Sequence, residues 1–170
     1  MVTFVNQGES MSAPRLQFAN EDPRSPEVLA ILARHLAFAR ATTPADHVHA
    51  LDLAGLLHPA VTFCGAREHG VLLAIGALKE LEASHGEIKS MHTVREARGR
   101  GLGTAMVQHL LALARQRGYR RISLETGTAP AFAPARRVYE RLCFQPCAPF
   151  AAYTRNEFST CMTLELGPGP

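Results

Sequence analysis

A short segment rich in glycine and arginine stands between a strand-like and a helix-like stretch of the sequence. It consists of Arg98, Gly99, Arg100, Gly101, Leu102, Gly103 and Thr104. A helix begins with several backbone N–H groups that lack partners within the helix, and its dipole makes this end positive. Glycines let the backbone approach a ligand closely, and arginines offer forked donors to phosphate oxygens. The segment therefore predicts a phosphate-binding site, for which a pyrophosphate is the most suitable ligand.

The spacing of this segment differs from two well-known phosphate loops. A P-loop ends in Gly-Lys followed by Ser or Thr, whereas Gly103 is followed by Thr104 and Ala105. The dinucleotide fingerprint Gly-x-Gly-x-x-Gly is also absent from the segment. Counted from Arg98, the pattern is Arg-x-x-Gly-x-Gly.

The elements predicted around this segment form a single α/β domain over residues 13–167. Residues 1–12 are interpreted as a flexible leader, either native or left over from cloning. Alternating and apolar patterns predict strands over residues 15–19, 61–68, 71–81, 86–94, 121–127 and 159–166. Helices are predicted over residues 25–41, 101–117 and 134–142, with a further short helix after a loop within residues 42–57.

The order of these elements predicts a mixed, mostly antiparallel sheet with helices on both faces. The strands 86–94 and 121–127 are joined through a helix, and such a crossover makes them parallel neighbours. The earlier strands are joined by tight turns, so we expect them to be antiparallel.

Composition and charge exclude several classes of protein. Of the 170 residues, 46% are apolar and 19% are charged, which is typical of a soluble globular domain. No apolar run reaches the ~20 residues of a membrane span, and no secretory signal is evident, so we expect a cytoplasmic protein without a membrane partner. A net charge of +3 without a run of Lys or Arg argues against a nucleic-acid partner.

The sequence predicts no metal site. The four cysteines, Cys64, Cys143, Cys147 and Cys161, lack zinc-ligand spacing and are interpreted as buried free thiols. His47 and His49 form a His-x-His pair, but no third ligand follows at regular spacing.

Two motifs in order resemble the GNAT superfamily of N-acetyltransferases. The segment Arg-x-x-Gly-x-Gly resembles the acyl-CoA pyrophosphate loop of that family. "ARRVYERLCF", residues 135–144, resembles its second signature, Ala-x-x-x-Tyr-x-x-x-Gly-Phe. The resemblance extends over residues 15–166, and stretches such as "GEIKSMHT" and "LETGTAPAFAPAR" are similar to a bacterial subgroup of mostly uncharacterised members.

The resemblance implies a function. It implies the GNAT acyl-CoA N-acyltransferase fold and an enzyme that transfers the acetyl group of acetyl-CoA, its co-substrate, to a primary amine. The expected acceptor is a small molecule or an amino acid, attacked directly in a ternary complex, and the chain could form a homodimer. The alternatives are a protein lysine or N-terminal acetyltransferase, and a non-catalytic acyl-CoA-binding module.

The resemblance also implies site residues. The backbone of the strand before the loop would pair with the pantetheine arm, and one of its N–H groups would polarise the thioester carbonyl. These residues are Met91, His92, Thr93 and Val94. The loop from Arg98 to Thr104 would hold the pyrophosphate. Separately, Arg136, Arg137 and Arg141 are interpreted as a solvated helix face, with contact of one of them to the 3′-phosphate as the alternative. Tyr139 would protonate the leaving thiolate.

The general base stays open among Glu87, His92, Glu125 and water. Strand alternation places Glu87 and His92 on opposite faces unless a bulge intervenes. Two departures from the family pattern stand out. Phe132 occupies a position that often holds a cofactor-binding Asn, and Cys143 replaces a glycine, which would strain a left-handed turn. Phe150 and Tyr153 are interpreted equally well as loop packing or as a wall of the acceptor site.

Overall fold

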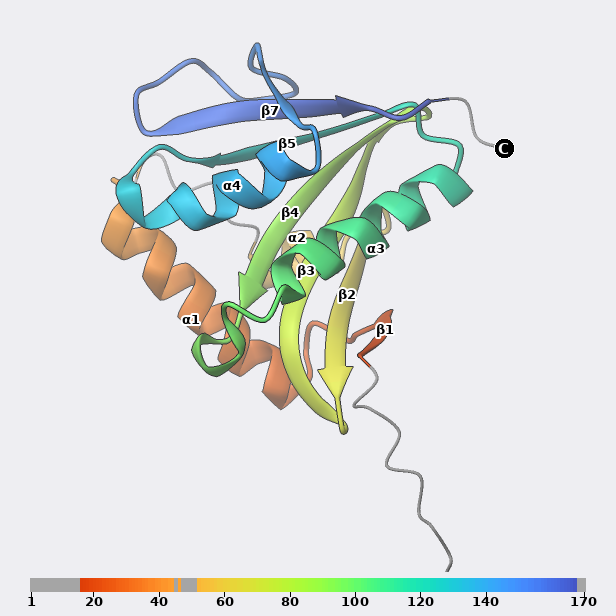
Figure 1. Ribbon diagram of the computed structural model, residues 1–170, viewed down its shortest axis with the longest axis vertical. Coiled ribbons are helices and arrows are strands. Elements are labelled where there is room, and N and C mark those ends of the chain that lie inside the picture. The colour runs from red at the N-terminus through yellow and green to blue at the C-terminus, as the bar shows by residue number, and fades with distance from the viewer. Residues whose placement is uncertain (1–15, 45, 47–51, 168–170) are drawn as a thin grey trace, which may run out of the picture.

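The computed structural model describes residues 16–44, 46 and 52–167, which form a seven-stranded sheet in the order β1-β2-β3-β4-β5-β7-β6 (Figure 1). The strands are β1 Gln17–Asn20, β2 Val61–Glu68, β3 Val71–Glu82, β4 His85–Thr93, β5 Arg121–Gly127, β6 Gln145–Cys147 and β7 Ser159–Glu165. β4 and β5 are parallel, and the other neighbouring pairs are antiparallel. The predicted mixed sheet is confirmed, whereas β6, three residues with Pro146 at its centre, was not predicted.

The helices are α1 Pro26–Thr42, α2 Leu53–Leu56, α3 Leu102–Gln116 and α4 Ala133–Arg141, with 3₁₀ turns η2 Arg95–Ala97 and η3 Pro130–Phe132. The N-cap Ser25 accepts a hydrogen bond from the N–H of Val28 at 3.4 Å, which starts α1 where the sequence predicts it. Along α3, buried residues recur at helical spacing and pack on the sheet. None of the described helices is long and apolar enough to cross a membrane.

α1 and α3 cover opposite faces of the sheet (Figure 1). A Cβ built on Gly76 of β3 would meet Met91 of β4 and Met106 of α3, so these residues share one face. His92 follows Met91 in β4, and the centroid of its ring lies 5.5 Å from that of His35 in α1. Consecutive strand residues point to opposite faces, so helices cover both faces, as the sequence predicts.

A bulge interrupts β4. Ile75 pairs with His92 and Ala77 pairs with Lys89, so Gly76 alone lies opposite Ser90 and Met91. Ser90 has a φ of +55°, in the left-handed region that a serine rarely adopts. The alternation of side chains therefore shifts by one residue after Lys89.

This bulge is the exception allowed for in the expected orientation of two candidate bases. Glu87 pairs with Lys79 and His92 pairs with Ile75, and these two β3 residues lie on the same face. Glu87 and His92 thus share the face covered by α1 instead of lying on opposite faces.

β4 and β5 diverge along their length (Figure 1). Their pairing begins at His85 with Arg121 and ends at Ile88 with Leu124, although β4 continues to Thr93 and β5 to Gly127. Beyond these pairs the two strand ends face a gap in the sheet.

Two of the cysteines depart from the prediction. Cys64 and Cys161 are buried free thiols as expected, but Cys143 is exposed and Cys147 is half-buried. His47 and His49 lie outside the described residues, and the described part of the chain holds no group of three His, Cys, Asp or Glu side chains suited to a metal ion.

Candidate functional site

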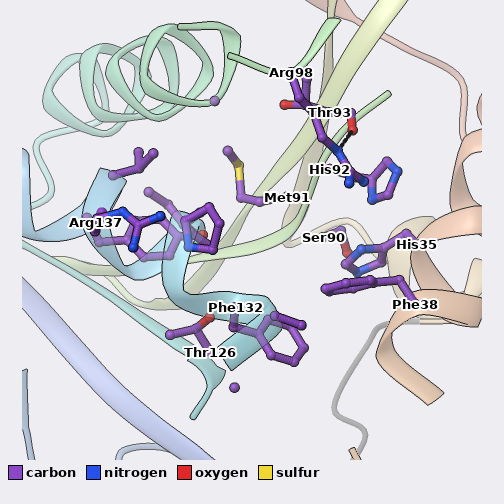
Figure 2. A pocket seen from close by; sticks show the side chains of 18 of the residues that line it. His35, Phe38, Ser90, Met91, His92, Thr93, Arg98, Thr126, Phe132 and Arg137 are labelled. Atoms are coloured by element: carbon purple, nitrogen blue, oxygen red, sulfur yellow. Dashed lines mark hydrogen bonds between the residues drawn. The ribbon is translucent and has the colours of Figure 1, made fainter. Parts of the chain in front are cut away.

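A cavity of about 720 Å³ occupies the gap between the diverging strands. Its walls are residues 88–93 of β4, residues 125–127 of β5, the loop before α3 with the first turn of that helix, α4, and one side of α1. Figure 2 shows His35 and Phe38 entering from α1, and Met91 and His92 from β4. Segments far apart in the sequence thus meet at one site.

The loop before α3 has the backbone conformation expected of an anion site. Gly99 and Gly101 have φ values of +77° and +81°, which favour glycine. Gly101 is the N-cap of α3 and provides no side-chain cap. Within the helix, the N–H of Ala105 donates to the carbonyl of Gly101 at 3.0 Å and is the first amide to donate within α3, so the amides of residues 102–104 have no acceptor in the helix. These amides and the helix dipole suit a phosphate group.

The arginines of the loop have different roles. Arg98 lines the cavity, and its Nε donates to the carbonyl oxygen of Thr93 at 3.2 Å (Figure 2). Arg100 instead forms an ion pair with Glu68 at 2.6 Å and is not among the lining residues. Arg137 and Arg141 of α4 line the cavity from the other side.

Arg136 supports the backbone of the cavity wall. Its Nη1 donates to the carbonyl oxygens of Gly127 at 2.5 Å and Ala129 at 3.3 Å. This leaves Arg137 and Arg141 as the two α4 arginines that face the cavity.

The β4 residues expected to contact the pantetheine arm lie along the gap. Met91, His92 and Thr93 line the cavity. Val94 is buried, and its N–H donates to the carbonyl of Leu73 at 2.9 Å, so that N–H is engaged within the sheet.

Tyr139 of α4 lines the cavity and is only 6% exposed. Burial, and secondly the negative charge of Glu125, raise the pKa of its phenol well above the usual range. The phenol is therefore protonated at neutral pH and can donate. Its ring packs edge-on against Phe144, with centroids 5.9 Å apart, which fixes the side chain.

The end of α4 keeps the turn that a glycine normally forms. The N–H of Phe144 donates to the carbonyl of Tyr139, and the N–H of Cys143 donates to that of Glu140, each at 3.0 Å. These two bonds form a Schellman motif. Cys143 adopts a φ of +67°, in the left-handed region. The turn is therefore kept without a glycine, and Cys143 carries the backbone strain expected from the sequence.

The three candidate bases differ in position. His92 and Glu125 line the cavity, whereas Glu87 does not and is 2% exposed. One oxygen of Glu87, Oε1, accepts from Lys89 Nζ at 3.0 Å and from the Tyr153 hydroxyl. Burial, followed by the charges of His35, Arg98 and Arg34, lowers the pKa of His92 to about 4. His92 is therefore neutral at physiological pH but a weak base.

Aromatic residues close the cavity near α1. The rings of Phe38 and Phe132 lie 5.0 Å apart in an edge-on arrangement (Figure 2). A Cβ on Gly127 would come within 2.3 Å of Phe132, so this close approach requires the glycine. Phe132 therefore forms an apolar wall of the cavity, at the position where the family pattern often has Asn.

Phe150 and Tyr153 pack together outside the lining residues. Their ring centroids lie 5.1 Å apart, and the Tyr153 hydroxyl also receives a hydrogen bond from Lys89. Of the two interpretations from sequence, this arrangement favours packing of the loop on the sheet. By contrast, His35, Phe38 and Ser90 line the cavity but were not among the predicted site residues. His35 and Phe38 lie outside the quoted stretches, and nothing in the stretch over residues 86–93 singled out Ser90.

Comparison with known proteins agrees with this geometry. Residues 26–144 match the Acetyltransferase (GNAT) family. Over 146 residues the chain is 41% identical to the uncharacterized N-acetyltransferase YsnE of Bacillus subtilis, covering 86% of this chain and 97% of that protein. It is 38% identical over 146 residues to the uncharacterized N-acetyltransferase YedL of Escherichia coli, covering 86% and 92% respectively.

The same fold occurs in N-acetylglutamate synthase from Neisseria gonorrhoeae, crystallised with coenzyme A and N-acetyl-glutamate. The two superpose with a TM-score of 0.68 and 17% identity, over 91% of this chain and 36% of that chain. The family match covers more than half of the chain, and the Bacillus protein matches nearly over its whole length. The chain is therefore a member of the GNAT family and an N-acetyltransferase that uses acetyl-CoA as its co-substrate.

Proposed function

We propose that the enzyme transfers the acetyl group to a primary amine of a small molecule or amino acid, by direct attack within a ternary complex. The observation that carries this proposal is the continuity of the cavity. It joins the first turn of α3, the gap between β4 and β5, and the side of α1 in one space. The two substrates can then meet without an intermediate carried by the protein.

The anionic part of acetyl-CoA fits one half of this cavity. The amides of residues 102–104 would bind the pyrophosphate, with Arg98 as a further donor. Arg137 and Arg141 offer charge to the remaining phosphate. Residues 91–93 would line the pantetheine arm, because β4 has no partner strand on this side of the gap.

The two proton transfers are assigned to two residues that line the cavity. Tyr139 supplies a proton to the departing thiolate, because its phenol is protonated at neutral pH and lines the cavity. Glu125 is the favoured acceptor of the ammonium proton, because it lines the cavity where Glu87 does not. Glu87 instead holds the side chains of Lys89 and Tyr153 in place through its hydrogen bonds to both.

The acceptor class rests on the cavity's size and on one structural relative. The space of about 720 Å³ must also hold part of acetyl-CoA, so what is left for the acceptor suits a small molecule. The Neisseria N-acetylglutamate synthase, which shares this fold over 36% of its chain, is complexed with N-acetyl-glutamate, the acetylated form of an amino acid. A protein lysine or N-terminal amine is the main rival acceptor.

The experiment is a thiol-release screen with acetyl-CoA against small amines, amino acids and amine-bearing peptides. Amine-dependent release with small acceptors is the expected result. Release with peptides alone would support the rival acceptor class. Binding of acetyl-CoA without release on any of these amines would contradict the proposed acceptor class and its rival.

We further propose that the enzyme works in the cytoplasm, since its cysteines are free thiols suited to a reducing compartment. A homodimer stays a prediction, which light scattering of the purified protein can test. Nucleic acid is not a proposed partner, because the net charge is only +3 and the sequence has no extended run of Lys or Arg.

A further inference from the structure

The hydroxyl of Ser90 lies in the cavity wall without a partner from the chain. Ser90 is 8% exposed and lines the cavity (Figure 2). Within the described residues, its Oγ is the one buried side-chain oxygen or nitrogen that lacks a hydrogen bond. A buried hydroxyl without a partner is costly and calls for an explanation, of which a ligand atom is one.

The backbone at Ser90 strengthens this argument. Its φ of +55° is unfavourable for any residue except glycine and, to a lesser degree, asparagine and aspartate. Glycine would adopt the bulge without strain, yet the position carries a side chain whose hydroxyl makes no bond within the described chain. Strained residues of this kind concentrate at functional sites.

The position of Ser90 also identifies the ligand atom. Ser90 shares the bulge with Met91, which faces α3 and the cofactor half of the cavity, and follows Lys89, which faces α1. It therefore lies where the two halves of the cavity meet. The acyl carbon must occupy this boundary when an amine from the α1 side attacks it.

We propose that the Ser90 hydroxyl donates a hydrogen bond to the acyl oxygen of acetyl-CoA during transfer. This inference rests on the proposed function. The amine nitrogen forms a bond to the acyl carbon, and the carbonyl π pair moves to the oxygen. The oxyanion then re-forms the carbonyl and expels the thiolate, while the nitrogen loses a proton and the sulfur gains one. The Ser90 donor stabilises the oxyanion more strongly than the neutral carbonyl.

Ser90→Ala removes the hydroxyl and keeps the Cβ. We expect kcat to fall about 100-fold, as for other single oxyanion donors, with the affinity for coenzyme A unchanged. The melting temperature should stay the same or rise, because an unsatisfied buried hydroxyl is removed. Ser90→Gly should lose the same activity, since it also lacks the donor but frees the backbone.

Ser123→Ala is the matched control. Ser123 is also buried, but its hydroxyl bonds to His85 Nε2 at 2.8 Å and to Thr163 Oγ1 at 3.0 Å. This variant should lower the melting temperature and leave kcat close to wild type.

The outcomes separate this inference from the proposed function. Wild-type enzyme without amine-dependent thiol release would overturn the proposed function itself. Wild-type release with an equally active Ser90→Ala variant would overturn the Ser90 inference alone. A Ser90→Ala variant with a raised KM for the amine and an unchanged kcat would likewise overturn the assignment to the acyl oxygen.

Discussion

At the scale of single residues, Tyr139 tests the proposed chemistry most directly. Tyr139→Phe keeps the ring that packs on Phe144 and removes the proton donor. We expect kcat to fall about 100-fold, within the usual range for a general acid, with the KM for acetyl-CoA nearly unchanged. Steady-state thiol release measures both constants.

Tyr119→Phe is the control for this variant. The Tyr119 hydroxyl donates to Glu80 Oε2 at 2.9 Å and is not among the residues that line the cavity. Its loss should leave kcat unchanged. If Tyr139→Phe behaves in the same way, Tyr139 is not the proton donor.

Glu125 and Glu87 should respond differently to substitution by glutamine. Glu125→Gln should lower kcat and leave the fold intact, because it removes the proposed base from the cavity wall. Glu87→Gln leaves the buried ammonium of Lys89 without its charge partner, and breaking such pairs costs about 3 kcal/mol of unfolding free energy. Urea denaturation and thiol release on both variants check this, and the reverse pattern would reassign the base to Glu87.

Cys143 offers a prediction of stability. Its φ of +67° costs a residue with a side chain about 1 kcal/mol relative to glycine. Cys143→Gly should therefore raise the unfolding free energy by about 1 kcal/mol and leave kcat unchanged. An unchanged or lowered midpoint in urea would show that the α4 turn is not strained.

At the scale of elements, the loop before α3 should depend on the left-handed torsion of Gly101. Gly101→Val forces a β-branched residue to a φ of +81° and places a side chain where the pyrophosphate would approach. We expect the affinity for coenzyme A, measured by calorimetry, to fall at least 10-fold.

Gly118→Val is the control for Gly101→Val, because it introduces the same torsional strain away from the phosphate site. Gly118 has a φ of +75° at the other end of α3, and a Cβ there would meet nothing within 4 Å, as at Gly101. Both variants should lose about 1–2 kcal/mol of stability. Equal coenzyme A affinity in the two folded variants would contradict the phosphate site.

Elements with a local signal could be predicted from the sequence, and those set by distant contacts could not. Gly101 and Gly103 mark the α3 start, and the crossover to β5 follows from the order of strand and helix. The bulge at Ser90 depends on how β4 aligns with β3, which no local pattern encodes. The contribution of α1 through His35 and Phe38 likewise depends on tertiary packing.

At the scale of the whole molecule, the residues that line the cavity favour direct attack over a route through a cysteine thioester. Among the described residues that line it there is no cysteine, and Cys161 lies buried with its pKa raised to about 11, mainly by burial. A thiol of this kind is a poor nucleophile at neutral pH. Direct attack requires that both substrates bind before either product leaves.

Initial rates measured against both substrates should therefore give intersecting lines in double-reciprocal plots, instead of the parallel lines of a ping-pong route. Mass spectrometry of the enzyme after incubation with acetyl-CoA alone should show the mass of the unmodified chain. Parallel lines together with a chain heavier by one acetyl group would establish a covalent intermediate. Because one continuous space holds the phosphate loop, the strand gap and the α1 wall, we expect the ternary complex to form within a single subunit.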